Sequence, residues 1–469
     1  MKVSSKIMLF LSFSLAACSG GNNPKTNDTS SAKFTGAKNE VKIMTLDPGH
    51  FHAALVLKKM YDQVDPTVYV YAPDGPDIEE HLARVEAYNH RGEDPTSWEL
   101  VVYKGDDYLE KMLAEKPGNV MNTAGNNAKK TDYILKSVEA GINVLADKPM
   151  VIDPAEFPKL EKAFGVADEK GLLLYDIMTE RYEITTVLQR ELSMLPEVFG
   201  KLETGTPDNP AITKESVHHF FKYVSGKPLT RPAWFFDTRQ QGEGIVDVTT
   251  HLVDLIQWEA FPEIILKKED VQVLSAKRWT TNLTPEMFEK STGLGSFPDF
   301  LQKDIENDEL KVFSNGEINY TLKGIHAKVS VTWNFEAPEG TGDTHYSIMR
   351  GTQCNLVIQQ GEKENYQPRL YIESTEDDVK ALSGNLYNAI QGLSEKYPGI
   401  ALEKLSDSMW TLNIPDSYKV GHEAHFGQVT EKYLQYLVDG KLPDWEVPNM
   451  ITKYYTTTEG LKAALKNDK

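Results

Sequence analysis

The chain has 469 residues, 40% of them hydrophobic, and a formal net charge of −19 at pH 7. This length and hydrophobic content are sufficient for two domains of ordinary size. The negative charge argues against nucleic acids and acidic polymers as partners, whereas neutral small molecules such as sugars remain compatible with it.

The N-terminal residues predict an exported protein. Lys2 and Lys6 precede an apolar run over residues 7–17, which has the length of a signal-peptide core and is too short to span a bilayer as a mature helix. The segment Leu15-Ala16-Ala17-Cys18 resembles a bacterial lipobox. The resemblance implies that residues 1–17 are a signal peptide and that Cys18 is lipidated. An ordinary secretory signal with an incidental cysteine is the alternative.

Residues 18–40 are rich in Ser, Gly, Asn, Thr and Lys, which predicts a flexible tether between the lipid and the folded chain. We therefore expect the protein in the periplasm or cell envelope of a bacterium, in contact with a membrane through its lipid anchor only. Cys354 is the only cysteine after Cys18, so no intramolecular disulfide is expected and a core must stabilise the fold.

From residue 41 to 180, short β-rich runs alternate with helical patterns, which is typical of a parallel sheet with crossover helices. The predicted strands are residues 41–46, 67–71, 100–103, 119–122, 143–146 and 172–176, and helical spacing occurs at 53–57, 108–114, 130–140 and 154–170. This pattern predicts a doubly wound dinucleotide-binding domain, whose ligand lies at the carboxyl ends of the strands.

The turn after the first predicted strand, Asp47-Pro48-Gly49-His50-Phe51-His52, keeps one glycine where such domains usually have G-x-G-x-x-G. Gly49 still permits a close approach to a phosphate. Asp74, after the second predicted strand, is placed to bind ribose hydroxyls, which favours NAD over NADP. The alternative is a turn aspartate before Gly75.

Asp247 and His251 interrupt an apolar segment that covers residues 242–256. They are four residues apart, so on a helix they would share one face. A carboxylate beside an imidazole handles protons in active sites, but such pairs also occur, fully hydrogen-bonded, in ordinary cores.

Two histidine patterns in the sequence are candidates for metal binding. His50, His52 and His218 lack a cysteine or carboxylate at ligand spacing, and His422-Glu423-Ala424-His425 is one residue short of H-E-x-x-H. The sequence therefore predicts no metal site, and the second pattern is interpreted as structural.

Residues 181–469 are predicted to form the second domain. Strand patterns cover residues 316–335, 345–359 and 368–373, with Gly-rich turns between them. A helical pattern runs from residue 420 through 437 and on to 465, and it would pack on this sheet or on the first domain.

Several motifs resemble those of one enzyme family. Asp147-Lys148-Pro149 is a near match to its Glu-Lys-Pro motif, and Ala124-Gly125-Asn126-Asn127 stands in place of its Thr-Pro-Asn turn. Asp247, His251 and Asp254 match its G-G-G-x-x-x-D-x-x-x-H-x-x-D helix, although only Gly242 of the glycine triplet is kept. In these motifs, over residues 41–260, the chain resembles the glucose-fructose oxidoreductase, inositol dehydrogenase and related (Gfo/Idh/MocA) group.

The resemblance implies an α/β fold, with an N-terminal Rossmann-type doubly wound parallel sheet and a C-terminal α/β domain that has a large, mostly antiparallel sheet. It implies a catalytic Lys148 near the nicotinamide and the substrate hydroxyl, Asp247 as a substrate-orienting partner, and His251 as the general acid/base. The family's broad sheets often pair, which leaves a homo-oligomer open.

The resemblance also implies a tightly bound NAD or NADP, which would be contacted by Gly49, His50, Asp74, Asn126 and Lys148. Arg181, His218 and Trp234 are the candidate substrate contacts, with Trp234 either stacked on a sugar ring or packed in the interior.

An exported enzyme has no dependable pool of free NAD, so it must retain its cofactor or return the hydride within each cycle. The first hypothesis is therefore an NAD-dependent oxidoreductase that acts on secondary hydroxyls of a sugar or glycoside and retains its cofactor. The alternatives are a glycosidase-like enzyme that oxidises its substrate transiently, and a carbohydrate-binding lipoprotein without redox activity.

Overall fold

The computed structural model describes residues 33–224, 227–337, 339, 341–375 and 379–467. The predicted signal peptide, Cys18 and most of the predicted tether lie outside these residues, so export and lipidation stay predictions. Among the described residues, no helix combines the length and the apolar composition that a membrane span requires.

The last residues of the predicted tether pack against the first domain. Phe34 contacts its hydrophobic core. The Glu40 carboxylate accepts hydrogen bonds from the backbone N–H groups of Thr35, Gly36 and Ala37 at 2.8, 3.0 and 3.1 Å. The prediction of a flexible tether is therefore wrong for residues 34–40, because composition does not reveal a turn that a single carboxylate caps.

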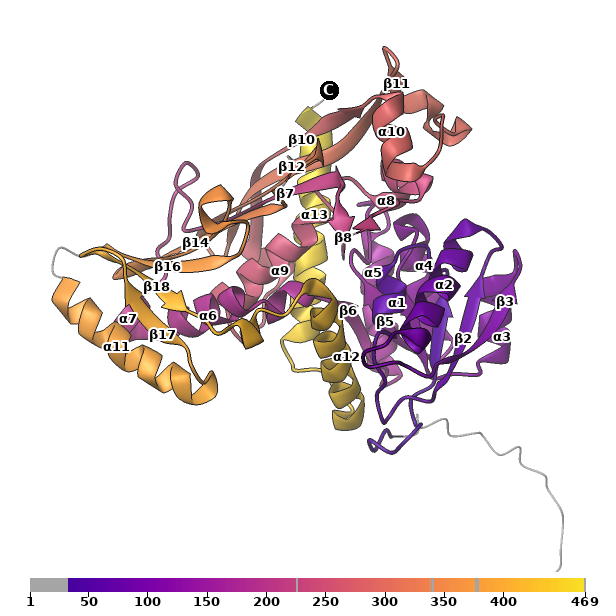
Figure 1. The fold of residues 1–469 in the computed structure, drawn as a ribbon, viewed down its shortest axis with the longest axis horizontal. Coiled ribbons are helices and arrows are strands. Elements are labelled where there is room, and N and C mark those ends of the chain that lie inside the picture. The colour runs from indigo at the N-terminus through magenta and orange to yellow at the C-terminus, as the bar shows by residue number, and fades with distance from the viewer. Residues whose placement is uncertain (1–32, 225–226, 338, 340, 376–378, 468–469) are drawn as a thin grey trace, which may run out of the picture. The chain divides into compact units, whose positions relative to one another are not determined.

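The first domain is built, within the described residues, on a six-stranded parallel sheet (Figure 1). Its order is β3-β2-β1-β4-β5-β6, which is the Rossmann order with a switch point between β1 and β4. The strands are β1 (Ile43–Leu46), β2 (Thr67–Ala72), β3 (Glu99–Lys104), β4 (Val120–Thr123), β5 (Asn143–Asp147) and β6 (Leu174–Ile177). All six predicted strands are confirmed, with shifts of only a few residues at their ends.

Helices connect these strands: α1 (His52–Leu55), α2 (Pro76–His90), α3 (Tyr108–Glu115), α4 (Asn127–Glu139) and α5 (Phe157–Glu169). Helix α1 is a single turn, shorter than the predicted run 53–57, because the chain tightens when the Leu57 N–H donates to the Ala54 carbonyl at 2.9 Å. No helix of ordinary length therefore follows β1, where a G-x-G-x-x-G turn would direct one at the cofactor.

The second domain is built on a sheet of ten strands in the part of the chain that the structure describes. All neighbouring strands are antiparallel except β7 and β13, which confirms the expected mostly antiparallel sheet. The order is β10-β12-β13-β7-β14-β15-β16-β18-β17, with β11 beside β12. The strands are β7 (Ile212–Phe221), β10 (Val271–Leu283), β11 (Ile305–Glu306), β12 (Glu309–Leu322), β13 (Ile325–Glu336), β14 (Thr344–Arg350), β15 (Cys354–Gln360), β16 (Arg369–Ser374), β17 (Ala401–Lys404) and β18 (Met409–Asn413), and β8 (Tyr223–Val224) pairs with β9 (Lys227–Pro228).

Helices and short 3₁₀ turns surround this sheet. The helices are α6 (Ile184–Ser193), α7 (Pro196–Phe199), α8 (Thr238–Gln241), α9 (Thr249–Ala260), α10 (Pro285–Thr292), α11 (Val379–Lys396), α12 (His422–Asp439) and α13 (Glu446–Asn467). The turns are η1 (Thr179–Tyr182), η2 (Ala233–Phe236), η3 (Lys268–Asp270), η4 (Asp299–Asp304), η5 (Glu362–Glu364) and η6 (Asp416–Tyr418). Helices α12 and α13 confirm the predicted C-terminal helical pattern.

The two C-terminal helices complete the core of the first domain. Phe426 and Tyr433 of α12 and Met450 and Tyr454 of α13 are buried in the same cluster as the parallel strands. Helix α13 also packs on β10 and α9 of the second domain (Figure 1). The predicted boundary at residue 180 thus separates segments that share a core.

A buried ion network holds α13 between the domains. Lys453 Nζ lies 2.7 Å from Asp176 Oδ2 and 2.9 Å from Asp254 Oδ1. Arg181 binds Asp254 through two nitrogens at 2.7 Å and Glu446 at 2.8 Å. Burial alone would raise the pKa of Asp254, but Arg181 and Lys453 hold this pKa far below its usual range. The buried charges of this network compensate one another only while every partner is present.

Replacing Lys453 with Met is expected to lower the free energy of unfolding by about 3–5 kcal/mol, because it leaves the buried Asp176 carboxylate without its cation and removes one of the two cations that bind Asp254. Urea denaturation of the variant and the wild type measures this difference. Lys462→Met, on an exposed face of the same helix, is the matched control and should leave the midpoint unchanged. Equal midpoints for Lys453→Met and the wild type would contradict a stabilising role for the network.

Candidate active site

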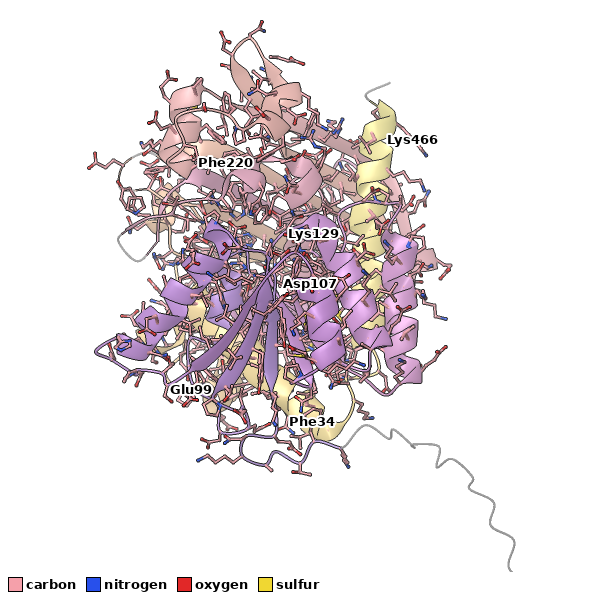
Figure 2. The ribbon with its side chains drawn as sticks, turned by 90° about the vertical axis from the view of Figure 1, so that its right-hand side faces the viewer. Phe34, Glu99, Asp107, Lys129, Phe220 and Lys466 are labelled. Atoms are coloured by element: carbon pink, nitrogen blue, oxygen red, sulfur yellow. The ribbon has the colours of Figure 1, made fainter. Side chains whose placement is uncertain are left out.

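The loops that follow β1 and β4 touch at the switch point of the first sheet. The His50 N–H donates to the Ala124 carbonyl at 3.0 Å, and a Cβ atom on Gly125 would lie 2.2 Å from the Asp47 oxygen. Only glycine allows this approach. In Figure 2, Asp107 and Lys129 mark this edge of the sheet, and Glu99 marks the opposite edge, where β3 begins.

Replacing Gly125 with Ala is expected to lower the free energy of unfolding by about 1–3 kcal/mol, because the methyl group overpacks the contact between the two loops. Chemical denaturation measures this loss. Gly165→Ala in α5 is the matched control, since its Cβ would meet nothing within 4 Å, and it should stabilise the helix by about 0.5–1 kcal/mol. Similar effects at both positions would show that the loops are not closely packed.

Lys148 and Asp247 form the central ion pair of the candidate site. Lys148 follows the end of β5, and its Nζ lies 2.7 Å from Asp247 Oδ1. Gln241 Nε2 donates to the second oxygen of Asp247 at 3.0 Å. Burial alone would raise the pKa of Asp247, but Lys148 and Gln241 hold it below its usual range. The pair joins the first sheet to the segment before α9, so both domains contribute to the site.

The residue spacing predicted that Asp247 and His251 share one face of a regular helix. In the structure, Asp247 lies before the helix that carries His251. Helix α9 begins at Thr249, and the preceding segment forms turns in which the Val246 N–H donates to the Glu243 carbonyl at 2.9 Å. A Cβ on Gly244 would lie 1.8 Å from the Ser314 oxygen. This close approach to β12 delays the start of the helix, and residue spacing alone does not reveal it.

His251 lies in the first turn of α9, and its buried Nδ1 has no hydrogen-bond partner among the residues that the structure describes. Burial lowers the pKa of His251 to about 4, and the charge of Lys148 adds to this effect. The imidazole is therefore neutral near pH 7, the state in which a ring nitrogen accepts a proton. A buried nitrogen without a partner costs free energy, which points to a bound molecule as its partner.

A chain of side chains beside this site was not assigned from the sequence. His52 Nδ1 lies 3.0 Å from Asp147 Oδ2, and His52 Nε2 lies 3.5 Å from His422 Nε2. His422 Nδ1 lies in turn 3.4 Å from Glu180 Oε1. The partners of His422 lie outside its own helix, His52 in α1 and Glu180 in η1, and the interpretation of His422 as structural stays a prediction. Asp147 directly precedes Lys148 and could have been assigned from the sequence, whereas the pattern that begins at His422 gives no indication of these distant partners.

A cavity of about 410 Å³ opens at the carboxyl ends of β1 and β2. The exposed carboxylate of Asp74 lines it, as the sequence suggested for a ribose contact. Trp234 donates from Nε1 to Asp77 Oδ2 at 2.7 Å, and a Cβ on Gly49 would lie 3.2 Å from its ring. Trp234 therefore lines the cavity at β1 and β2, and its role as a substrate contact stays a prediction. The volume is in the range of small-molecule sites.

Three other predicted residues make contacts away from Lys148 and His251. Arg181 is engaged by the ion network of α13. His218 stacks on Trp333 with ring centroids 5.1 Å apart, and Asn126 caps α4 and donates to Gln240 at 2.8 Å. Within the described residues, no hydrogen bond or ion pair joins them to Lys148 or His251. Their roles as cofactor or substrate contacts stay predictions.

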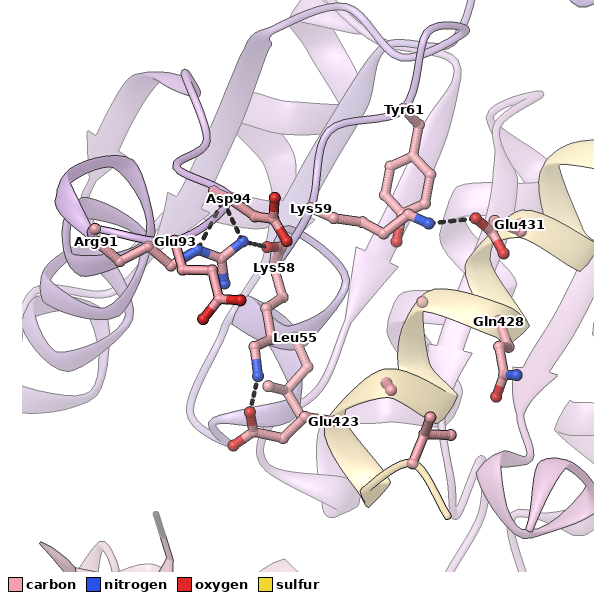
Figure 3. Close-up of a pocket in the computed structure, with 14 residues that line it drawn as sticks. Leu55, Lys58, Lys59, Tyr61, Arg91, Glu93, Asp94, Glu423, Gln428 and Glu431 are labelled. Atoms are coloured by element: carbon pink, nitrogen blue, oxygen red, sulfur yellow. Dashed lines mark hydrogen bonds and ion pairs between the residues drawn. The ribbon is translucent and has the colours of Figure 1, made fainter. Parts of the chain in front are cut away.

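A second cavity of about 740 Å³ lies between the segment after α1 and helix α12 (Figure 3). Lys58 pairs with Glu423 and Lys59 with Glu431 across it. Its lining contains no imidazole among the described residues, so it lacks the proton-handling groups of the first site. The two ion pairs fasten α12 to the first domain and hold its first residue, His422, beside His52.

Comparison with known proteins assigns the chain to a family. Residues 188–465, more than half of the chain, match the family described as "Putative oxidoreductase C terminal domain". The crystal structure of a "putative oxidoreductase" from Parabacteroides merdae ATCC 43184 is 59% identical, covers 93% of this chain and 100% of its own, and has a TM-score of 0.92. No curated protein matches the chain.

Two more distant structures share the fold. Levoglucosan dehydrogenase in complex with NADH is 11% identical with a TM-score of 0.56, and covers 91% of this chain and 97% of its own. KijD10, a 3-ketoreductase from Actinomadura kijaniata in complex with TDP-benzene and NADP, is 14% identical with a TM-score of 0.52, and covers 89% and 96%. The two distant structures show the fold alone, whereas the family match and the Parabacteroides merdae structure show that the chain belongs to the oxidoreductase family defined by this C-terminal domain.

Proposed function

We propose that this oxidoreductase uses a retained nicotinamide cofactor to oxidise secondary hydroxyl groups of a sugar or glycoside. The observation that carries the proposal is the Lys148–Asp247 ion pair at the edge of a Rossmann sheet. The neutral His251, whose Nδ1 has no partner among the described residues, lies close enough for the charge of Lys148 to lower its pKa. The enzyme assignment argues against the third alternative, a carbohydrate-binding protein without redox activity.

The residues of the site suit this reaction. Oxidation of a secondary alcohol requires that the hydroxyl proton leave while the carbon gives up a hydride, and His251 is in the protonation state that accepts this proton. Lys148 Nζ holds the hydroxyl oxygen and stabilises the negative charge that develops on it. Asp247 orients Lys148 and accepts a hydrogen bond from a second hydroxyl. The nicotinamide, when bound, supplies the hydride acceptor.

The cavity at β1 and β2 suits a dinucleotide. Asp74 would bind the ribose hydroxyls, which favours NAD because a carboxylate repels the 2′-phosphate of NADP. The fold neighbours, in complex with NADH and NADP, support a nicotinamide cofactor in general. Retention follows from the predicted export, since free NAD is not dependable outside the cytoplasm.

Cofactor content tests the proposal. The purified protein is denatured, and the released small molecules are assayed for NAD(H) and NADP(H) by mass spectrometry. We expect NAD close to one equivalent per chain. NAD added to a stripped sample should raise the melting temperature in proportion to the logarithm of its concentration. Absence of nucleotide together with no thermal shift would overturn the proposal.

A glycosidase-like enzyme with transient oxidation is the second candidate. The observation that favours it is a second set of proton-handling groups, His422 and Glu180, beside the ion pair and His251. Such a reaction needs a base for the C–H bond next to the transient ketone and an acid for the leaving group. Incorporation of deuterium from D₂O into recovered substrate at that carbon would support this candidate over simple oxidation.

A further inference from the structure

We propose that His50, His52 and Asp147 bind a divalent transition-metal ion next to Lys148. One ligand atom from each of the three side chains lies within 4.8 Å of the others. His52 and Asp147 are 9% and 5% exposed, and His50 is half-buried, so the cluster is shielded from bulk water. Two imidazoles and one carboxylate form a donor set that suits first-row transition metals and leaves coordination positions open for substrate.

A count of protons favours a cation at this place. Asp147, His52, His422 and Glu180 make three successive contacts at 3.0, 3.5 and 3.4 Å. Each contact needs one proton between two acceptors, but two neutral imidazoles supply only two N–H groups. One contact therefore joins two lone pairs, unless an extra proton or a metal ion lies between them. The contact between His52 and Asp147 is the one that His50 also faces, since its ring centroid is 4.1 Å from that of His52.

With a metal ion between His52 Nδ1 and Asp147, the two imidazole N–H groups are sufficient for the two remaining contacts. His52 donates from Nε2 to His422 Nε2, and His422 donates from Nδ1 to Glu180. A ligating histidine commonly donates its second N–H to an acceptor of this kind, which fixes the tautomer and the ring orientation. The Lys58–Glu423 ion pair holds α12 where His422 can act as that acceptor.

The neighbouring cations leave the Asp147 carboxylate available. Lys148 is compensated by Asp247 at 2.7 Å. Lys130 donates to the Asn127 side chain at 2.5 Å and to the backbone oxygen of Asp147 at 2.9 Å, not to its carboxylate.

The site differs from the cluster that residue spacing suggested. His218, which was grouped with His50 and His52 in the sequence, lies on β7 and contacts Asp343 and Ser216 instead. The missing carboxylate comes from the end of β5, because the parallel sheet brings the ends of β1 and β5 to the same edge.

Metal content of the full-length protein, purified without a histidine tag, tests the proposal. After removal of metal with a chelator, the protein is titrated with Zn²⁺ and Co²⁺, and bound metal is counted by mass spectrometry. We expect one equivalent per chain and a ligand-field absorption band for Co²⁺. His50→Ala and Asp147→Asn should abolish both, and Glu180→Gln should weaken binding by about 10–100-fold, because it weakens the acceptor that orients His422 and, through it, His52. His218→Ala is the matched control and should bind like the wild type.

Each outcome decides the proposal. Wild-type protein that takes up neither ion, or His50→Ala and Asp147→Asn variants that are folded and still bind one equivalent, would overturn it. In the first case an extra proton completes the chain. Asp147→Asn preserves the shape of the side chain, so it remains informative if His50→Ala fails to fold. The test is independent of the nicotinamide proposal, because metal is counted without substrate or cofactor.

Discussion

Replacing His251 with Asn is expected to lower kcat by about 10²–10⁴-fold, the usual contribution of a general base. The cofactor content should not change, because His251 lies outside the cavity at β1 and β2. Steady-state kinetics on an oxidised sugar, with nicotinamide measured in the same preparation, separates the two effects. His90→Asn, on the exposed face of α2, is the matched control and should keep wild-type rates.

The pH profile distinguishes a base from a merely structural histidine. Because burial lowers the pKa of His251 to about 4, kcat/KM should stay level from pH 7 down to about 5 and fall near pH 4. An ordinary histidine would place this fall near 6.5. The same depressed pKa destabilises the folded state as pH drops from 6.5 to 4, since the unfolded chain binds the proton first. A near wild-type kcat for His251→Asn would show that His251 is not the general base.

Replacing Lys148 with Met should lower both activity and stability. Loss of the donor to the developing oxyanion is expected to reduce kcat by about 10²–10³-fold. The change also leaves the Asp247 carboxylate buried without its cation, which costs about 3–5 kcal/mol of unfolding free energy. Enzyme kinetics and urea denaturation measure the two effects separately.

A double variant separates the two roles of Lys148. Adding Asp247→Asn to Lys148→Met removes the uncompensated charge, so most of the lost stability should return. Activity should stay low, because neither residue can then act on the substrate. Recovery of activity together with stability would show that the ion pair is only structural.

The sequence predicted the architecture correctly because the parallel strands are short apolar runs between turns. Strands β1, β4, β5 and β6 are buried throughout, which produces such runs. Lys148 was found because it follows β5 directly, and the sheet then fixes its place at the ligand edge. Local sequence patterns therefore predicted the parallel strands and the residue that follows the carboxyl end of β5.

What the sequence did not reveal depends on contacts between distant segments. The start of α9 is set by the approach of Gly244 to Ser314, more than one element away. Arg181 was predicted at the substrate, but it is bound to Asp254 and Glu446, and Glu446 belongs to the last helix. His422 reaches the site because α12 packs into the core of the first domain and two ion pairs join the same surfaces. None of these contacts has a signature in residue spacing.

Hydride transfer to a nicotinamide held by the protein is the most direct test of the account. NAD-loaded wild-type and His251→Asn proteins are mixed with a panel of methyl glycosides, and the absorbance of reduced nicotinamide is followed over a single turnover. We expect at least one glycoside to reduce the bound cofactor in the wild type, and the variant to do so far more slowly. Equal rates in both proteins, or no reduction by any glycoside with NAD fully bound, would contradict sugar oxidation at this site.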